Sequence, residues 1–410
     1  MIEELVSIVI PVYNCSDTIC DTVSSVLNQT YKNMEIIIVD DCSTEDIIGK
    51  VQSLQDNRIR YYRNKKNMGA NYSRNYGILH SKGRFIAFQD SADIWMQDKL
   101  EKQMAMFSDE NIDAVYCETE YIKQDGTHKI VPDRWKDDKN RNECIYYTLL
   151  YTNIIDTPSL IVKKECLIEC GMFDEDMPRL QDWELCLRLA KSYKFLCVNE
   201  ILSKGRYRKD SISSDYKRLI TAGSLLIKKN IKEMEEEKVV IYNIMNFFRE
   251  ALEESYGMIT PQQLKAEFYN SYGKEFLQKY GITNVILEDM IKDFRFRKYY
   301  YVYSIILNKI SSSENLTFDF SNKSVAIYGY GTLGKILYKQ LIKENVNVKY
   351  VIDDDNRIEA DVTVYRCSQI PENNLTDIVI VTPIYDFIKI KEKLELIGNQ
   401  EVVSIETVFM

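Results

Sequence analysis

Apolar and polar positions in the first third of the chain alternate in blocks that predict strands joined by helices. Short β-branched and aromatic runs are separated by helical stretches such as DTICDTVSSVLNQ and NYSRNYGILHSK; the runs are SIVIPV, EIIIVDD, IRYYRN, RFIAFQD and AVYCETEYI. Strands that alternate with crossover helices are typical of a largely parallel sheet. The opening region is therefore predicted to be an α/β domain.

The pattern changes twice further along the chain. From about residue 215 to 315, long segments with a helical period predict an all-helical region, including a helix that starts at Pro261. After the polar stretch SSSENLTFDFSNK, the remaining residues return to strand and helix alternation. A chain of 410 residues is also too long for one compact core. We therefore expect an α/β domain over 1–215, a helical region over 216–320 and a smaller α/β domain over 321–410.

Charge and hydropathy limit the classes of partner. The net charge of −9 argues against a dedicated nucleic-acid binder, because phosphate binding needs an excess of Lys and Arg. No stretch approaches the roughly 20 apolar residues that span a bilayer. The start MIEELVSIVIPV lacks a basic leader and a small-residue cleavage site. These observations predict a cytoplasmic protein.

One segment leaves room for peripheral contact with the inner face of the membrane. Residues Asp293–Ile310 combine basic residues with aromatic and aliphatic ones, as a helix lying on a membrane does. Packing against another domain explains the same pattern and is the more ordinary interpretation.

Few types of side chain are available in this sequence as metal ligands or catalytic groups. Its ten cysteines include no Cys-x-x-Cys pair, so reduced and mostly buried thiols are expected rather than disulfides or a zinc site. His80 and His128 are the two histidines of the sequence, which leaves little material for a His-rich metal site or a Ser-His-Asp triad. Carboxylates are therefore the expected catalytic groups.

Five short patterns follow one another in the first 190 residues. They are SIVIPVYN (Ser7–Asn14), EIIIVDDCS (Glu35–Ser43), NMGANYSRNYG (Asn67–Gly77), RFIAFQDSADIW (Arg84–Trp95) and LQDWELCLRL (Leu180–Leu189). Together they resemble the family 2 glycosyltransferases, GT-A fold enzymes that move a sugar from a nucleotide donor onto an acceptor hydroxyl. The resemblance covers roughly the first half of the chain.

The resemblance implies a donor site built from the first four patterns. Open α/β sheets normally bind their ligands at the carboxyl ends of the strands. The family's donor-binding positions correspond here to Pro11, Val12, Tyr13, Asn14, Asp40, Asn67, Arg74, Gln89, Asp90 and Ser91. Among them, Asp40 is expected to accept a hydrogen bond from a uracil ring. Arg74 suits a diphosphate because its planar guanidinium offers several N–H donors to the phosphate oxygens.

The fourth pattern departs from the family at its metal motif. Family members usually carry Asp-x-Asp followed by another Asp and use Mn²⁺ or Mg²⁺, whereas this chain reads Asp90, Ser91, Ala92, Asp93. A methyl group cannot coordinate a cation, and the segment Gly205–Ser213 lacks the histidine that often serves as a further ligand. Asp90 remains the candidate metal ligand.

Two explanations are compatible with this departure. Either a cation is held mostly by the diphosphate, Asp90 and water, or cationic side chains stabilise the leaving group. The candidates for the second role are Arg74, Arg206, Arg208 and Lys209.

The fifth pattern provides the expected catalytic base. In an inverting transfer a carboxylate takes the proton of the attacking acceptor hydroxyl, and by resemblance that carboxylate is Asp182. An ordinary Asp has a pKa of about 3.9, so it is a weak base unless it is partly desolvated. Trp183 beside it is expected to shield the carboxylate or to stack on the acceptor. Asp182 would equally serve as the N-cap of a helix.

The last part of the chain carries a dinucleotide-type fingerprint. Gly329, Gly331 and Gly334 form GxGxxG between a predicted strand and a helix, and Asp353 ends the next predicted strand. This part resembles Rossmann-like modules appended to sugar and polysaccharide biosynthesis proteins. Its length is about half that of a full dinucleotide-binding domain, so a structural, oligomerisation or regulatory nucleotide-binding role is favoured over NAD(P)-dependent catalysis.

The sequence therefore predicts an inverting glycosyltransferase that uses a nucleotide sugar, for example UDP-GlcNAc. The acceptor is a surface polysaccharide, a lipid-linked glycan or a protein Ser or Thr such as on flagellin. Ala92 and the missing histidine motivate the alternative of a non-catalytic nucleotide-sugar sensor or scaffold.

Overall fold

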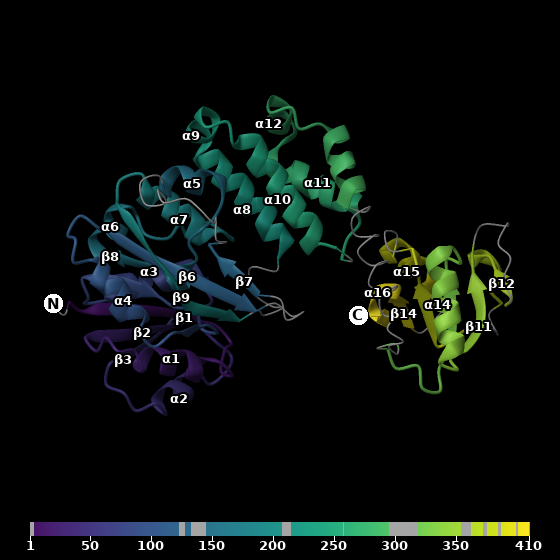
Figure 1. Cartoon of the computed structure of the whole chain (residues 1–410), viewed down its shortest axis with the longest axis horizontal. Helices are drawn as coiled ribbons and strands as arrows, with labels where there is room; N and C mark the ends of the chain where they lie inside the picture. Colours follow the sequence, from purple (N-terminus) through teal and green to yellow (C-terminus); the bar gives the residue numbers. More distant parts are fainter. Residues whose placement is uncertain are drawn as a thin grey trace. The chain divides into compact units, whose positions relative to one another are not determined.

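The computed structural model describes residues 4–122, 128–132, 145–206, 215–256, 258–294, 316, 318–353, 362–371, 375–383, 387–398 and 401–409. The chain divides into two compact units, Met1–Phe247 and Phe248–Met410. Each unit contains a β-sheet of its own (Figure 1).

The first unit is built on a mixed sheet with the strand order β3-β2-β1-β4-β8-β6-β9-β5, and β7 pairs with β6. Its strands are β1 (Val6–Val12), β2 (Met34–Asp40), β3 (Ile59–Arg63), β4 (Phe85–Phe88), β5 (Ile94–Trp95), β6 (Ala114–Ile122), β7 (His128–Val131), β8 (Ile161–Lys163) and β9 (Phe195–Arg206). Its helices are α1 (Ile19–Leu27), α2 (Ile47–Gln52), α3 (Ala70–His80), α4 (Lys99–Met106), α5 (Ile145–Tyr151), the 3₁₀ turn η1 (Thr157–Ser159), α6 (Lys164–Glu169), α7 (Gln181–Ala190), α8 (Tyr216–Lys229), α9 (Ile231–Glu236) and the first half of α10 (Val240–Glu254).

The strand β1 lies at the centre of this unit and is buried on both faces. Ile8 and Ile10 belong to the hydrophobic core that also contains buried residues of α1 and α2. On the opposite face Val9 meets α3, where Gly77 leaves no room for a side chain: a Cβ there would lie 2.4 Å from Val9 Cγ1. Because both faces are covered, the strand is apolar throughout rather than alternating.

The strands β1, β2, β3 and β4 pair in parallel, which brings the ends of the first, second and fourth patterns and the start of the third to one edge of the sheet. In the observed register Val12 pairs with Asp40, and Asp40 pairs with Arg63. On the other side of β1, Val9 pairs with Phe88, so that the residues following β4 leave the sheet at the same edge. The expected α/β architecture is confirmed, and the predicted runs correspond to β1, β2, β3, β4 and β6.

The second unit combines helices with a five-stranded parallel sheet of order β12-β11-β10-β13-β14. Besides the second half of α10, its elements are α11 (Pro261–Tyr272), α12 (Lys274–Lys279), β10 (Ser324–Tyr328), α14 (Thr332–Lys343), β11 (Asn347–Ile352), β12 (Val364–Tyr365), η3 (Cys367–Gln369), β13 (Ile378–Val381), α15 (Phe387–Glu395), β14 (Glu401–Ser404) and α16 (Ile405–Phe409). The helix predicted to start at Pro261 is α11, whose N-cap Thr260 forms a capping box with Gln263.

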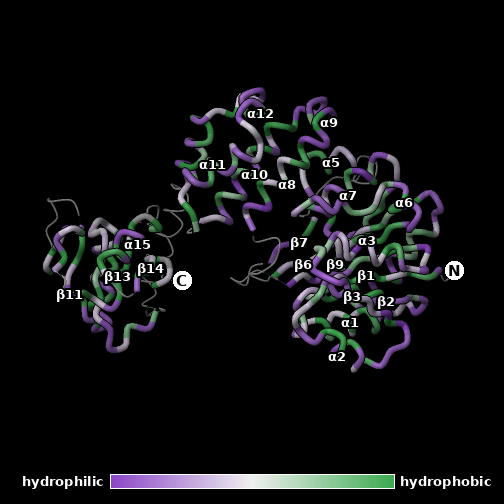
Figure 2. Tube along the Cα trace, turned by 180° about the vertical axis from the view of Figure 1, so that it is seen from behind, coloured by the Kyte–Doolittle hydropathy of each residue, from purple (hydrophilic) through white to green (hydrophobic). Residues whose placement is uncertain are grey.

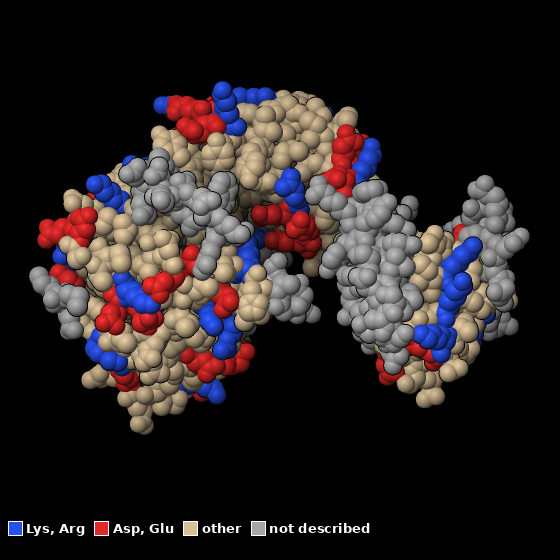
Figure 3. All heavy atoms as spheres, in the orientation of Figure 1, with Lys and Arg blue, Asp and Glu red and all other residues tan. Residues whose placement is uncertain are grey.

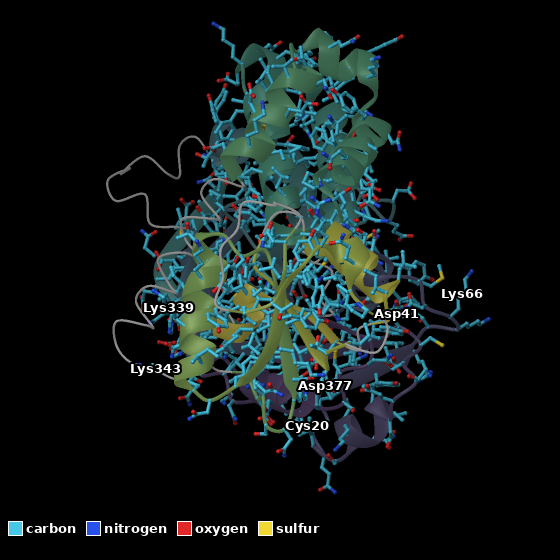
Figure 4. All side chains as sticks on the ribbon, turned by 90° about the vertical axis from the view of Figure 1, so that its right-hand side faces the viewer. Cys20, Asp41, Lys66, Lys339, Lys343 and Asp377 are labelled. Carbon is cyan, nitrogen blue, oxygen red and sulfur yellow. The ribbon has the colours of Figure 1, made fainter. Side chains whose placement is uncertain are left out.

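The parallel sheet of the second unit is covered on both faces. One core joins Val325 and Ile327 of β10 to α14 and α16, and a second joins Ala326 to α15. Asp377, labelled in Figure 4, precedes β13. It ties β10 and β13 together at their amino ends, since its carboxylate accepts hydrogen bonds from the backbone and side chain of Ser324. Hydrophobic residues gather along the interior strands of each unit, and peripheral loops are hydrophilic (Figure 2).

The structure places the helices of the predicted middle region in both units. Helices α8, α9 and the first half of α10 belong to the first unit, and α11 and α12 belong to the second. The expected division at 1–215, 216–320 and 321–410 stays a prediction.

Acidic and basic side chains are interspersed over the visible face of the first unit (Figure 3). In the second unit, Lys339 and Lys343 lie exposed one turn apart on α14 (Figure 4). In the described ranges, no helix combines the length and the apolar character that crossing a membrane requires. Most of the segment Asp293–Ile310, considered above for membrane contact, lies outside the described residues.

The contact between α3 and β1 gives a first prediction. Gly77→Ala should lower the free energy of unfolding of the first unit by about 1–3 kcal/mol, because overpacking a core costs more than Ala gains in helix propensity. The double variant Val9→Ala/Gly77→Ala should be less destabilised than the sum of the two single variants, since removing the Val9 methyls makes room. Urea unfolding followed by tryptophan fluorescence measures this directly, because the tryptophans of the chain, Trp95, Trp135 and Trp183, all fall within the sequence range of the first unit. Additive effects would show that the two side chains do not compete for the same space.

Candidate functional site

The loops that follow β1 and β2 are tied to each other at the edge of the sheet. Asn14 adopts a left-handed conformation, with φ of 49°. Its backbone N–H donates to Ser43 Oγ at 3.0 Å, and its side-chain oxygen accepts from the backbone of Thr44 at 2.9 Å. Asn14 therefore joins the first and second patterns. Its neighbour Tyr13 is 47% exposed and free to meet a ligand.

Some of the predicted donor-binding residues are buried in the protein itself. Pro11 and Val12 lie within β1, and Gln89 is fully buried, with its side-chain N–H donating to the backbone oxygen of Asp93 at 2.7 Å. Asn67, in contrast, is exposed at the start of the third pattern. Direct side-chain contact with a donor is therefore open to Tyr13 and Asn67 in this conformation and closed to Val12 and Gln89.

Asp40 is fully buried at the end of β2 and is engaged with its own neighbours. One carboxylate oxygen accepts from Tyr61 Oη at 2.5 Å and from Arg63 Nη1 at 2.6 Å, and the other accepts from the backbone of Ser43 at 2.8 Å. Burial together with the hydrogen bond to Asp40 raises the pKa of Tyr61 to about 12. The expected contact of Asp40 with uracil stays a prediction, and such a contact has to share this carboxylate with the half-exposed Arg63.

The adjacent Asp41 positions the third pattern. Its carboxylate accepts from Asn64 Nδ2 at 2.8 Å and from the backbone N–H groups of Met68 at 2.8 Å and Gly69 at 2.7 Å. Gly69 is the N-cap of α3 and has a φ of 93°, a conformation that favours glycine. Asp41 thus fixes where α3 begins relative to β2.

An ion pair joins α3 to the fourth pattern. Arg74 is 3% exposed, and its Nη2 donates to Asp90 Oδ1 at 2.7 Å. The guanidinium carbon lies 5.3 Å from the centre of the Phe173 ring, a cation–π arrangement. Arg74 Nε and Nη1 are buried and have no hydrogen-bond partner within the described ranges. A buried and incompletely paired guanidinium is a strong local source of positive potential.

Asp90 is the accessible acid of the fourth pattern. Its side chain is 40% exposed, so that the oxygen not bonded to Arg74 is available to solvent or to a ligand. Asp93, in contrast, is buried, and its Oδ1 accepts from the backbone N–H of Arg206 at 3.1 Å. Burial, reinforced by the charge of Asp90, raises the pKa of Asp93 well above its usual range. The carboxylate of Asp93 therefore binds the backbone at the end of β9 and does not face a ligand.

The rest of the fourth pattern is held by the first. Ser91 Oγ donates to Cys15 Sγ at 3.1 Å, and the backbone oxygen of Ser91 accepts from Thr18 Oγ1 at 2.8 Å. The buried Ala92 presents a methyl group where the family has a carboxylate.

The described residues do not fit a metal centre held by the protein. Within the described ranges, no group of three or more His, Cys, Asp and Glu side chains is arranged to hold a metal ion. Asp90, and not the buried Asp93, is the acid of the fourth pattern whose carboxylate is accessible. A cation at this place would take most of its ligands from a donor diphosphate and water.

Asp182 lies in the first turn of α7, where its Oδ1 accepts from the backbone N–H of Trp183 at 2.8 Å. Burial raises the pKa of Asp182 to about 6, with further upward contributions from the charges of Asp156 and Asp90 and a downward one from Arg74. At neutral pH the carboxylate is therefore largely ionised and is a stronger base than an ordinary Asp.

Trp183 shields this region and is not available to an acceptor. The residue is 6% exposed, and its indole N–H donates to the backbone oxygen of Leu149 in α5 at 2.6 Å. The ring also contacts Phe247, with 5.7 Å between the ring centres. Of the two roles expected for Trp183, the shielding role fits this position, and stacking on an acceptor does not.

Asp156 belongs to the same electrostatic cluster and was not predicted. It is buried just before η1, where its carboxylate accepts from Tyr121 Oη at 2.6 Å and Thr119 Oγ1 at 3.0 Å. Burial raises its pKa, and the charge of Asp90 adds to the effect. The segment NIIDTPS carries no pattern that marks Asp156 as functional, because its proximity to the site depends on the packing of β6 against η1.

Of the cations proposed to stabilise a leaving group, Arg74 is held within the site, and Arg206 follows Gly205 at the end of β9. The Arg206 side chain is about half exposed and lies 3.6 Å from Asp21. Arg208 and Lys209 lie outside the described residues.

The glycine pattern of the second unit has the expected strand–turn–helix setting. Gly329 has a φ of 84°, and a Cβ on Gly334 would lie 2.1 Å from Gly329 O, which requires glycine for close packing of α14. Gly331 faces open space at the N-cap of α14. Asp353 follows β11, and its Oδ2 accepts from the backbone N–H of Tyr330 at 2.7 Å. Asp353 thus fixes the glycine loop, and nucleotide binding here stays a prediction.

Comparison with known proteins identifies the family of the chain. The sequence profile of Glycosyl transferase family 2 matches residues 7–166. The chain is 34% identical over 218 residues to the Escherichia coli UDP-Glc:alpha-D-GlcNAc-diphosphoundecaprenol beta-1,3-glucosyltransferase WfgD, a match that covers 52% of this chain and 82% of WfgD. It is 45% identical over 122 residues to the E. coli enzyme WfaP, named for the same reaction, over 30% of this chain and 48% of WfaP.

Among solved structures, residues 1–349 of S. aureus TarS superpose with a TM-score of 0.51 at 16% sequence identity, over 78% of this chain and 94% of the TarS chain. This likeness shows the fold. The GT-A fold and the match to WfgD together define the class: the chain belongs to the family 2 glycosyltransferases.

The charges around Asp182 predict how its pKa responds to substitution. Arg74→Gln should raise the pKa of Asp182 above about 6, because it removes the cation that favours the carboxylate, and Asp90→Asn should lower it by removing a neighbouring negative charge. Shifts of roughly 0.5–1 unit are expected for charges near a buried carboxyl. Carboxyl NMR of ¹³C-aspartate protein, with Asp182→Asn identifying the resonance, measures both. Titration of Asp182 near 4, unmoved by either variant, would contradict this electrostatic description.

Proposed function

We propose that this protein is an inverting transferase that moves a hexose or N-acetylhexosamine from a UDP-sugar to an acceptor hydroxyl, with Asp182 as the base. The observation that carries the proposal is the position of Asp182, a half-buried carboxylate with a raised pKa beside the Arg74–Asp90 pair. This position supports a base and a donor site at the same edge of the sheet.

The relatives support the nature of the donor and the acceptor. WfgD and WfaP are both named for transfer of glucose from UDP-glucose to a diphosphoundecaprenol-linked GlcNAc. A UDP-sugar is therefore the favoured donor class, with UDP-glucose and UDP-GlcNAc the first to test. Of the acceptors considered from the sequence, a lipid-linked glycan is favoured over a finished surface polysaccharide and over a protein Ser or Thr.

In the proposed step, the acceptor oxygen attacks the anomeric carbon from the side opposite the diphosphate, and a new C–O bond forms. The bond from that carbon to the β-phosphate oxygen breaks, and its electron pair leaves with UDP. The proton of the acceptor hydroxyl passes to the carboxylate of Asp182, whose raised pKa makes it a better acceptor than an ordinary Asp.

The local charges constrain how the diphosphate is bound. Arg74 provides one positive charge beside the carboxylates of Asp90 and Asp182, so the site does not by itself attract a group that carries two or more negative charges. Additional positive charge must come from a divalent cation bound to the diphosphate, with Asp90 as protein ligand, or from Arg206 and the basic residues that follow it. We favour the cation, since Asp90 keeps an accessible oxygen.

In this proposal the second unit is not redox-active. Its glycine loop and the backbone-bound Asp353 fit a structural, oligomerisation or regulatory nucleotide-binding role.

Removing the base tests the proposal most simply. Asp182→Asn should lower kcat by about 10²–10⁴-fold, the usual contribution of general base catalysis, with donor affinity unchanged. Asp109→Asn provides a matched control, because Asp109 is an exposed carboxylate between α4 and β6. Release of UDP from a panel of UDP-sugars with lipid-linked acceptors provides the assay. Undiminished transfer by Asp182→Asn would exclude Asp182 as the base, and donor binding without transfer by the unmodified protein would favour a sensor.

Removal of metal separates the two sources of positive charge. Chelation with EDTA should abolish transfer, and added Mn²⁺ or Mg²⁺ should restore it, because the charge of the leaving UDP is otherwise uncompensated. Without donor, Mn²⁺ should bind only weakly, since the described residues form no multidentate site. Calorimetric titration of Mn²⁺ with and without UDP measures this difference. Full activity in EDTA would instead assign the role to cationic side chains.

A further inference from the structure

The loop that precedes Asp182 has an unfavourable backbone conformation. Between the end of α6 and the start of α7, Gly171, Met172 and Leu180 have φ values of 85°, 58° and 60°. Residues with side chains lose conformational free energy in the left-handed region, so Met172 and Leu180 adopt it only where other contacts hold them. Leu180 is the N-cap of α7 and has no side-chain capping bond. The direction in which α7 presents Asp182 therefore depends on what holds this loop.

Asn75 of α3 holds the loop at Phe173. Its Nδ2 donates to the backbone oxygen of Phe173 at 2.9 Å, and its Oδ1 accepts from the backbone N–H of the same residue at 2.9 Å. The Nδ2 group also donates to Glu175 Oε1 at 2.9 Å. The side chain thus pairs with the loop backbone as a neighbouring strand would, and Asn75 is only 7% exposed. Buried bonds of this kind are costly to lose because they leave backbone groups unpaired.

Asn71, one turn earlier on α3, holds the next part of the loop. Its Nδ2 donates to the backbone oxygens of Asp174 at 2.8 Å and Met177 at 3.0 Å. Asn71 is 8% exposed. The two asparagines together bind the loop backbone over residues 173–177, which lie 98 to 106 positions away from them in sequence.

The same face of α3 carries Arg74. Residues at i, i+3 and i+4 of a helix lie on one side, so Asn71, Arg74 and Asn75 form a continuous surface. Arg74 contacts Asp90 of the donor side and lies over Phe173, the residue that Asn75 binds. One rigid helix face therefore touches both the acid of the fourth pattern and the loop that delivers the base.

Two other side chains, from α7 and α8, also bind the loop. Arg188 Nη2 of α7 donates to the backbone oxygen of Met172 at 2.7 Å, and Lys229 of α8 pairs with Asp174. Neither contacts Asp90 or α3 according to the hydrogen bonds of the described residues. Among the hydrogen bonds and ion pairs of the described residues, the link between Asp90 and this loop therefore runs through α3. An apolar contact adds to it, because the Phe173 ring packs edge-on against Phe88 at the end of β4, with 5.2 Å between the ring centres.

We propose that Asn71 and Asn75 are positioning residues for the transfer reaction, which hold the strained loop 171–180 on α3 and thereby set Asp182 relative to Asp90. The inference rests on the proposed function for the identity of the base and deepens it by naming what places that base. Neither asparagine touches the reacting atoms.

The first test separates positioning from general stability. Asn75→Ala should lower kcat by about 10²-fold, the scale of a misplacement of about 1 Å, while the Kd for UDP-sugar stays within about twofold of the original value. Gln29→Ala is the matched control, since Gln29 is a buried amide that likewise donates to and accepts from a distant backbone segment, Met96 and Leu100. Equal losses of kcat in the two variants, or a loss confined to donor affinity, would overturn the proposal.

A second test exchanges donor and acceptor in the hydrogen bond between the side chains of residues 75 and 175. Asn75→Asp keeps the acceptor for the Phe173 N–H but places a carboxylate against Glu175, so kcat should fall. Adding Glu175→Gln supplies an amide that donates to the new carboxylate. The kcat of the double variant should therefore be at least about tenfold higher than that of Asn75→Asp, as expected for one regained charge-assisted bond. Glu175→Gln alone should keep most of the activity, because the oxygen of the new amide can still accept from Asn75 Nδ2. Failure of the double variant to exceed Asn75→Asp would show that this bond does not position the base.

A third measurement needs no turnover and so distinguishes failure of this inference from failure of the proposed function. Amide hydrogen exchange in residues 171–180 should accelerate at least about tenfold in Asn75→Ala and not in Gln29→Ala. Unchanged exchange in Asn75→Ala would overturn the inference even in an active transferase. Accelerated exchange in a protein that transfers no sugar would show that Asn75 holds the loop and would reject the proposed reaction instead.

Discussion

The ion pair between Arg74 and Asp90 is the interaction on which the rest of the site depends. It joins a buried guanidinium on α3 to the half-exposed acid that follows β4. The same charge lowers the pKa of Asp182, which burial raises to about 6. One buried cation thus balances two carboxylates for which different tasks are proposed: Asp90 as an accessible ligand for the donor side and Asp182 as a partly desolvated base. Without it, the two acids would repel each other in a region of low dielectric.

The scaffold determines where that pair lies. The burial of β1 on both faces, with Gly77 packed against Val9, fixes the distance of α3 from the sheet. Asp41 fixes where α3 starts by accepting backbone bonds from Met68 and Gly69. From the other end of the sheet, Asp93 and Asp156 are buried acids that tie β9 and β6 to the site. The third pattern therefore connects the other patterns physically, in addition to any contact with a donor.

Much of this could be predicted from sequence, because the signals are local. Apolar runs such as EIIIVDD predict buried strands, and the order of the five patterns identifies the family and leads to the proposal of Asp182 as the base. The departure at Ala92 is also visible without a structure. The roles of Asn71, Asn75 and Asp156 are not, since they depend on contacts between segments far apart in the chain that no spacing rule reports. Likewise, burial of Trp183 under α5 follows from tertiary packing and changes the interpretation of its role.

The central claim is that one carboxylate, Asp182, activates the acceptor on the side opposite the leaving diphosphate. The stereochemistry of the product tests it most directly. With an α-linked UDP-sugar as donor, proton NMR of the glycan product should show a β-linkage, because a single displacement inverts the anomeric carbon. An α-linked product would contradict the account, since retention of configuration requires a different arrangement of catalytic groups from the one built around Asp182, Asp90 and Arg74.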